Sequence, residues 1–181
     1  NKKINVAFRN DIDCDIYTAK KMSEYYKDNK IIATFFLLHT CYYYRQNNNY
    51  PIERCKDLSK NILDINNEYC SIGLHLDPLH VYTDLNGNGA KEVENEINWL
   101  REIVDVNSMC AHNSYYVNGA ENFEIFKELS KRDSFIYKDK KIPLSTLSTE
   151  KLNITEINYP LIKNLNNFKL SDSSWNKFKL F

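Results

Sequence analysis

The sequence predicts a parallel α/β fold, on two observations. Short apolar stretches with strand character alternate along the chain with longer segments whose apolar residues recur at helical spacing. Acidic, histidine or asparagine side chains follow each of the first four strand-like stretches, and parallel α/β folds gather functional groups at the carboxyl ends of their strands. The 181 residues suffice for one well-buried domain, and no repeat or low-complexity linker divides them, so we expect a single domain over residues 1–181.

The first half of the chain predicts three strands separated by two helices. A strand is expected over 4–8 and an amphipathic helix over 16–27. The nearly continuous apolar run over 31–38 is typical of a parallel strand covered on both faces. A short helix over 58–65 and a strand over 70–76 follow.

The second half continues the alternation and then becomes irregular. An apolar stripe predicts a helix over 90–104, and a short strand follows over 109–111. A further helix is expected over 123–130 and a further strand over 134–137, which would add parallel βα units. The segment 143–170 is expected to form loops with one or two weak strands.

Charge and hydropathy limit the possible partners. Lysine plus arginine (24) balances aspartate plus glutamate (24), so no global field favours nucleic acid or an anionic membrane surface. No apolar run approaches the length of a membrane span, and the first residues are too short and polar to act as a secretion signal. The chain starts at Asn1 rather than at methionine, which leaves a removed leader open.

The cysteines indicate a reducing compartment. They are odd in number, widely spread and without a CxxC pair, which excludes zinc-finger spacing. Reduced and mostly buried thiols are the simplest interpretation, and a cytoplasmic location is therefore expected. The five are Cys14, Cys41, Cys55, Cys70 and Cys110.

Candidate metal ligands collect where the predicted strands end. Asp11 and Asp13 alternate, as two groups on one side of a strand do, directly after the first apolar stretch. Three of the four histidines, His39, His75 and His112, directly follow apolar strand-like runs. Carboxylates and imidazoles converging on one rim predict a site for a divalent metal ion.

The stretch SIGLHLDPLH, residues 71–80, leaves two assignments open. His75 and Asp77 alternate as groups at a strand end do, whereas His80 is too far along to share a helical face with His75. Pro78 argues against a helix through the whole stretch. Asp77 and His80 therefore compete as a ligand or as a partner of a ligand.

A second, weaker cation motif lies downstream. Asp84, Asn86, Asn88 and Gly89 match the first, third, fifth and sixth positions of a calcium loop. The twelfth position is Asn95 rather than a bidentate glutamate. A glycine-rich turn leading into the next helix is the better interpretation.

Five stretches together resemble a divergent branch of the polysaccharide deacetylases, the NodB-like superfamily. They cover nearly the whole chain in order: RNDID (9–13), ATFFLL (33–38), SIGLHLD (71–77), AHN (111–113) and SDSSW (171–175). The resemblance implies a distorted (β/α) barrel of about seven parallel strands. It also implies one divalent metal ion and hydrolysis of the N-acetyl group of an amino sugar.

Carried over by position, the resemblance implies a role for each motif residue. Asp11 matches the catalytic base, Asp13 a metal ligand and His75 the first metal histidine, and Arg9 precedes the acids as in the divergent branch. His112 is our first choice for the third ligand. The second choice is His80.

The chain departs from the main family at three points. Ile12 separates the two acids, which the main family has adjacent, and Leu79 stands where the family's second histidine would be. No histidine follows His112 to protonate the leaving amine, so either the sequence stops short of it or the enzyme is impaired. Asp172 is read either as a rim residue orienting Arg9 or a substrate hydroxyl, or as the N-cap of a short helix.

The expected function is metal-dependent N-deacetylation of an N-acetylated sugar, or of a sugar-linked precursor, in surface-polysaccharide biosynthesis. Zinc is the expected ion, with cobalt or nickel as alternatives. Tyrosines after the second and fourth strands, among them Tyr42, offer rings for stacking on sugars. The alternative is a catalytically silent relative that binds sugar or acts as a scaffold. A phosphate hydrolase fits less well, because the rim lacks a basic cluster.

Overall fold

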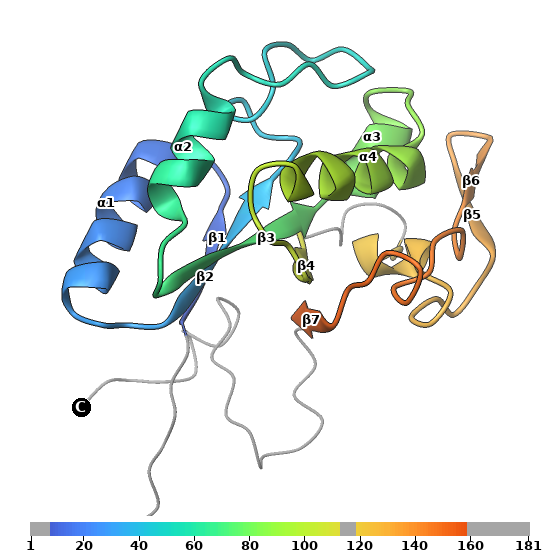
Figure 1. Cartoon of the computed structure of the whole chain (residues 1–181). Helices are drawn as coiled ribbons and strands as arrows, with labels where there is room; N and C mark the ends of the chain where they lie inside the picture. The colour runs from blue at the N-terminus through green and yellow to red at the C-terminus, as the bar shows by residue number, and fades with distance from the viewer. Residues whose placement is uncertain (1–7, 113–118, 159–181) are drawn as a thin grey trace, which may run out of the picture.

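A five-stranded parallel sheet forms the centre of the molecule. The structure is a computed structural model that describes residues 8–112 and 119–158 (Figure 1). The strand order is β1-β2-β3-β4-β7, and every neighbouring pair is parallel. The predicted parallel α/β class is confirmed. The strands are β1 (Phe8–Ile12), β2 (Ala33–Leu38), β3 (Cys70–Leu76), β4 (Ser108–Ala111) and β7 (Glu156–Asn158).

Helices connect the first four strands of the sheet, and local sequence fixes where these helices start. The Asp15 side chain caps α1 by accepting hydrogen bonds from the Tyr17 and Thr18 amides at 3.0 and 3.1 Å. Asn88 caps α4 in the same way, accepting from the Lys91 amide at 3.0 Å. Pro78 starts α3, as the first helical position allows. The α-helices are α1 (Ile16–Asp28), α2 (Leu58–Ile65), α3 (Pro78–Thr83) and α4 (Gly89–Arg101).

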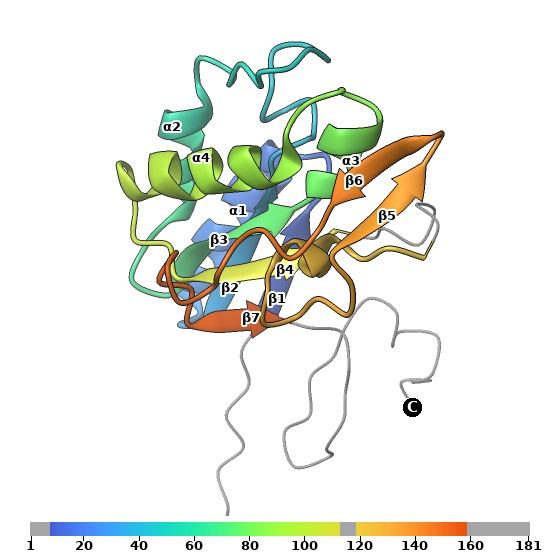
Figure 2. The same ribbon diagram turned by 90° about the vertical axis from the view of Figure 1, so that its right-hand side faces the viewer.

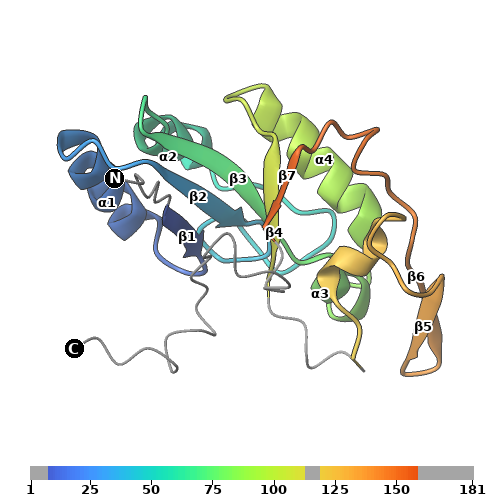
Figure 3. The same cartoon turned by 90° about the horizontal axis from the view of Figure 1, so that it is seen from below.

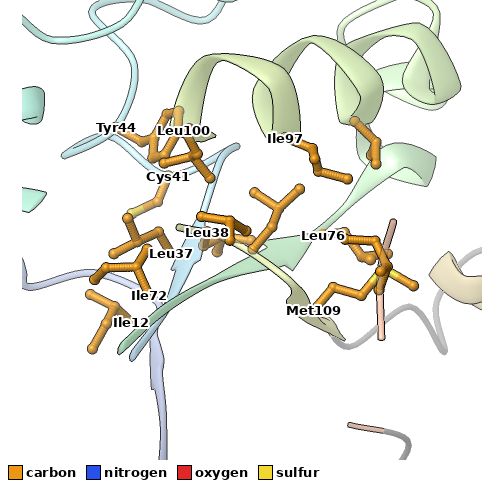
Figure 4. Close-up of a cluster of buried hydrophobic side chains, with 14 of the residues drawn as sticks. Ile12, Leu37, Leu38, Cys41, Tyr44, Ile72, Leu76, Ile97, Leu100 and Met109 are labelled. Atoms are coloured by element: carbon orange, nitrogen blue, oxygen red, sulfur yellow. The ribbon is translucent and has the colours of Figure 1, made fainter. Parts of the chain in front are cut away.

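The helices α1, α2 and α4 lie along the same side of the sheet (Figure 3). On this side the rings of Tyr26 in α1 and Phe35 in β2 are 5.9 Å apart. Ile97 and Leu100 of α4 point at the apolar side chains of the sheet, including Leu76 (Figure 4). Alternation along the strands therefore commits every second residue to a helix-covered core and leaves the others to the opposite face.

Strand register places the candidate site residues on that opposite face. Asp11 pairs with Phe36, and Phe36 pairs with Gly73. Two residues beyond Gly73, His75 pairs with Cys110 of β4. Residues in register in parallel strands point to the same side, so these five positions share a face. Gly73 is required there, because a Cβ atom would lie 2.5 Å from the Phe36 ring.

The strand predicted at 134–137 forms, but the parallel βα unit expected for it is wrong. β5 (Ser134–Tyr137) pairs antiparallel with β6 (Lys140–Pro143) as a separate hairpin beside the main sheet (Figure 2). Lys138 and Asp139 form the tight turn with positive φ angles of 46° and 64°. This is the geometry of a two-residue hairpin loop, which joins neighbouring strands without a helix.

Two other boundaries correct the sequence prediction. The first strand ends at Ile12 rather than at Phe8, so Asp11 lies within it instead of after it. Residues 4–7 lie outside the described residues. The helix expected over 123–130 is only the 3₁₀ turn η1 (Asn122–Ile125).

No helix forms over 123–130, because the backbone there makes hydrogen bonds to a distant segment around Leu147. Phe126 is extended and forms a bridge with Leu147, and the Lys127 amide donates to the Leu147 carbonyl at 2.9 Å.

No helix among the described residues is long and apolar enough to cross a membrane.

Candidate metal centre

Asp13, His75 and His112 converge at the carboxyl edge of the sheet. His75 lies near the end of β3, while Asp13 and His112 directly follow β1 and β4. Nε2 of His75 is 3.2 Å from Oδ1 of Asp13 and 3.0 Å from Nδ1 of His112. Nδ1 of His112 is 3.5 Å from the same Asp13 oxygen. The structure thus brings together two predicted ligands and the preferred third one.

The size of this triangle suits a small divalent cation. Bonds of ~2.1 Å around a tetrahedral zinc ion put neighbouring ligand atoms ~3.4 Å apart. The three separations here run from 3.0 to 3.5 Å. Asp13 is 52% exposed while His75 is buried, so one side of the triangle faces solvent. One carboxylate and two imidazoles, with room for a further ligand, fit a transition-type divalent ion better than calcium or magnesium.

Electrostatics prepare this triangle for a cation. Hydrogen bonds from His112 and then His75 hold the pKa of Asp13 well below its usual value, against the opposing effect of partial burial. Burial acts to lower the pKa of His112, but the hydrogen bond to Asp13 and the neighbouring carboxylates raise it above its usual value. The acid is therefore ionised wherever the protein is folded near neutral pH, and its negative charge favours a cation at this position.

Asp11 lies beside the triangle, held by Arg9. Nε of Arg9 donates to Oδ1 of Asp11 at 2.7 Å, and a terminal guanidinium nitrogen donates to Oδ2. The two residues are neighbours on one face of β1, where this bidentate pair forms readily. Oδ2 of Asp11 is 3.9 Å from Nε2 of His75. The arrangement fixes the orientation of the Asp11 carboxylate close to the candidate ligands.

The structure adds Cys110, which the sequence did not single out. Its Sγ lies 3.0 Å from Nδ1 of His75 and 3.5 Å from Oδ1 of Asp11, and its own carbonyl oxygen lies 3.4 Å from the same His75 nitrogen. Burial, followed by the charge of Asp11, raises the pKa of this thiol well above its usual value. Asp11, His75 and Cys110 form a second set of potential ligand atoms. The sequence did hold one sign of this: Cys110 stands two residues before His112, a spacing that places both side chains on one side of an extended strand.

Asp77 is buried next to the candidate centre and is linked to it through hydrogen bonds. Asn122 donates to one of its oxygens and the Thr40 hydroxyl to the other, both at 3.0 Å. The amide of Asn122 also donates to the His112 carbonyl at 3.0 Å. Asp77 is 5% exposed. Both of its oxygens are engaged, so it anchors the segment that carries His112 and is not placed among the ligands.

His39 is a buried brace between two strand ends. Its Nε2 accepts a hydrogen bond from the Asp77 amide at 2.8 Å. Complete burial lowers the pKa of His39 to about 4, so the ring is neutral at pH 7. The neutral ring with an acceptor at Nε2 carries its proton on Nδ1. The sequence predicted His39 among the metal-site residues at the strand ends. In the structure its ring is fully buried and bonds to the Asp77 amide.

His80 lies on α3, and the structure does not bring it to the centre. Its Nδ1 is 3.1 Å from Oδ2 of Asp84, one helical turn away. Among the described residues it belongs to neither set of potential ligands. Asp172 lies outside the described residues.

The calcium-like segment has other contacts. Asp84 faces His80, Asn86 accepts from the Lys140 ammonium at 2.7 Å and Asn88 caps α4. The glycine-rich turn feeding a helix is confirmed.

A cavity of about 310 Å³ opens beside the first turn of α1. Tyr17 and Tyr42 line it and are 67% and 70% exposed, and Asp57 and Asn61 add polar groups. Tyr43, which also lines it, donates its hydroxyl to the carbonyl of Ile12 at 2.7 Å. Since Asp13 follows that carbonyl in the chain, the cavity wall is tied to the segment that carries a candidate ligand.

Comparison of the chain with protein-family models, with curated proteins and with solved structures finds no match.

Proposed function

We propose that this protein is a metal-dependent hydrolase that removes the N-acetyl group from an amino sugar. The observation that carries the proposal is the convergence of Asp13, His75 and His112, with Asp11 held beside them by Arg9. Three neutral or anionic donors next to an oriented carboxylate are the parts that metal-assisted amide hydrolysis needs.

The resemblance to the polysaccharide deacetylases supports the same assignment. The stretch 9–13 lies on and just after β1, 71–77 on and just after β3, and 111–112 at and just after the end of β4. Motifs far apart in sequence therefore meet at one edge. Helices on one side of the sheet and polar functional residues on the other suit a distorted barrel of about seven parallel strands. We propose that the five parallel strands are part of such a barrel.

We assign the divalent ion to Asp13, His75 and His112, with zinc as the preferred metal. A zinc ion held by these side chains supplies Lewis-acid polarisation of an amide carbonyl and makes water more acidic. Asp13 contributes the negative charge, and each histidine contributes one unprotonated nitrogen.

The remaining steps fall to Asp11 and Arg9. Oδ2 of Asp11, the oxygen facing His75, takes the proton of the attacking water as that water adds to the acetamide carbon. Arg9 holds the carboxylate by two hydrogen bonds, turned towards the centre. His39 and His80 lie away from the centre. We therefore also assign to Asp11 the return of that proton to the leaving nitrogen as the C–N bond breaks.

The tyrosine-lined cavity supports a sugar substrate. Exposed rings such as Tyr17 and Tyr42 present apolar faces that suit the C–H face of a pyranose, and Asp57 and Asn61 suit its hydroxyl groups. All five cysteines are free thiols, which supports a reducing compartment and substrates met in the cytoplasm, namely N-acetylated sugars or sugar-linked precursors.

An acetate-release assay tests the proposal. The protein is loaded in turn with zinc, cobalt and nickel and given free, oligomeric and nucleotide-linked N-acetyl sugars. Acetate should appear with at least one metal and sugar, should disappear with chelator, and should be lost in Asp11→Asn. If sugars bind measurably but none releases acetate, the protein is a silent sugar-binding relative, and the hydrolase proposal fails.

A further inference from the structure

We propose that Cys110 is a positioning residue, whose thiol links the metal ligand His75 to the base Asp11 through consecutive hydrogen bonds. The inference rests on the proposed metal centre and names a residue of that centre which neither the sequence motifs nor the resemblance contains. It does not require that the substrate be a sugar.

Register explains why a thiol is available at this place. Cys110 pairs with His75 across the parallel strands β3 and β4, so the two side chains rise from the same face at the same level. The residue two positions later is His112, the neighbouring candidate ligand. Cys110 is fully buried, and the sulfur is enclosed between the ring of His75 and the carboxylate of Asp11.

The direction of the hydrogen bonds follows from the role of the ring. His75 turns Nε2 towards Asp13 and His112, and a ligand nitrogen must carry a lone pair rather than a proton. The proton of the neutral ring is then on Nδ1. That N–H has two acceptors from the same residue, the sulfur of Cys110 at 3.0 Å and its carbonyl oxygen at 3.4 Å.

The thiol hydrogen completes the link. Sγ lies 3.5 Å from Oδ1 of Asp11, within range for a sulfur donor, and Nε of Arg9 donates to the same oxygen. Asp11 is therefore oriented from two sides, by a guanidinium and by a thiol. Buried ligand histidines are commonly oriented through their second nitrogen by a carboxylate or a carbonyl oxygen. Here a thiol shares that place with a carbonyl.

The same geometry argues against Cys110 as a ligand of the ion. Its sulfur faces Nδ1 of His75, while Asp13 and His112 face Nε2 on the other side of the ring. An ion bound to Nε2 therefore lies on the opposite side of the His75 ring from the sulfur. Asp13 also opens one side of its set to solvent, whereas the set containing Cys110 is largely enclosed.

Metal affinity and the cobalt spectrum test this assignment without substrate. Affinity for zinc and cobalt is measured by competition with a chromophoric chelator in wild type, Cys110→Ala, Cys110→Ser and Cys110→Val. Loss of the sulfur should weaken binding by about 10- to 100-fold, as for other groups that orient a ligand histidine. Serine should recover part of the loss, because its hydroxyl both accepts and donates.

Cys70→Ala is the matched control. Cys70 is a buried thiol of the same sheet whose sulfur faces α1, 3.8 Å from the Ser23 carbonyl. Its removal should leave metal affinity unchanged. If Cys110→Ala does not fold, as judged by circular dichroism, the serine and valine variants decide, because valine preserves the volume and removes the hydrogen bonds.

Three results would overturn the proposal. Equal affinity in wild type and in folded Cys110 variants would show that the thiol has no effect on His75. A thiolate-to-cobalt charge-transfer band in the wild type, lost in Cys110→Ser, would make the sulfur a ligand. Absence of any tight metal binding would remove the centre itself. By contrast, a Cys110-dependent affinity in a protein that releases no acetate would overturn the proposed function and leave this inference standing.

Discussion

His75 and His112 meet edge to face at the end of β3 and β4, with ring centroids 4.9 Å apart and planes at 88°. In this arrangement Nε2 of one ring is 3.0 Å from Nδ1 of the other, and both approach one oxygen of Asp13. Two imidazole nitrogens this close need a proton or a cation between them. The short distance between the two rings therefore requires that either a shared proton or a bound cation occupies this position.

The two acids of the motif should respond differently to mutation. Asp13→Ala removes a candidate ligand, so metal should be lost on gel filtration. Asp11→Asn should leave the metal bound while acetate release disappears, because the base is not needed for binding. Elemental analysis of protein purified without chelator measures the first effect, and the acetate assay the second. Equal loss of metal from both variants would mean that the roles are misassigned.

Tyr42→Ala should weaken binding of N-acetylglucosamine oligomers. Loss of one stacked ring costs about 1 kcal/mol, or about fivefold in the dissociation constant. Calorimetric titration of Asp11→Asn protein, in which turnover is blocked, measures it. Tyr25→Ala is the control, because Tyr25 is similarly exposed at 61% but does not line the cavity. Equal affinities in the two variants would place the sugar elsewhere.

The stability of the protein should depend on an ion pair between Arg54, in the loop after β2, and the buried Glu96 of α4. Arg54 donates to both oxygens of Glu96 at 2.9 and 2.8 Å and lies 4.2 Å above the Trp99 ring. Arg54→Ala leaves the fully buried Glu96 charge without its cation, which should lower the free energy of unfolding by about 3 kcal/mol.

Urea denaturation measures this loss, with Lys91→Ala as the control. The pair Lys91–Glu94 lies on the exposed side of α4, and its loss should cost less than about 1 kcal/mol. Similar losses from both variants would contradict the prediction.

Glu92 should make stability fall as pH rises. Burial and then Glu96 raise the pKa of Glu92 to about 8, from an ordinary value near 4.5. Between these values the folded protein holds a proton that the unfolded chain has released. The free energy of unfolding therefore decreases with pH, by at most about 1.4 kcal/mol per pH unit. Glu92→Gln should remove this slope. Urea denaturation between pH 5 and pH 8 compares the two proteins, and parallel curves would disprove the assignment.

Sequence predicted the parts of the site that depend on strand ends. Apolar runs are long and unambiguous in β2 and β3, so His39 and His75 were placed correctly near the ends of strands. Parallel order then brought Asp13, His75 and His112 to one edge. Which strands are neighbours, and in which register, is a tertiary property. That is why Cys110, the partner of His75 across β3 and β4, was not predicted as part of the site.

Helix boundaries account for two further differences from the prediction. Pro78 excludes a helix through the whole stretch 71–80, as predicted, but the helix α3 that starts at Pro78 was not predicted, and on it His80 lies beside Asp84. The apolar spacing over 123–130 is helical, but the backbone there bonds to the segment around Leu147. A long-range bridge of this kind leaves no periodic signal in the residues that form it.

The strand order has a kinetic consequence. Asp13 and His75 lie on either side of β2, so the three candidate ligands come together only after β1, β2, β3 and β4 have paired in register. A bound ion then stabilises the finished sheet and does little for the half-assembled chain. Saturating metal should therefore slow unfolding in stopped-flow experiments and leave the refolding rate nearly unchanged. Such an ion locks the native sheet after it has formed and does not nucleate it.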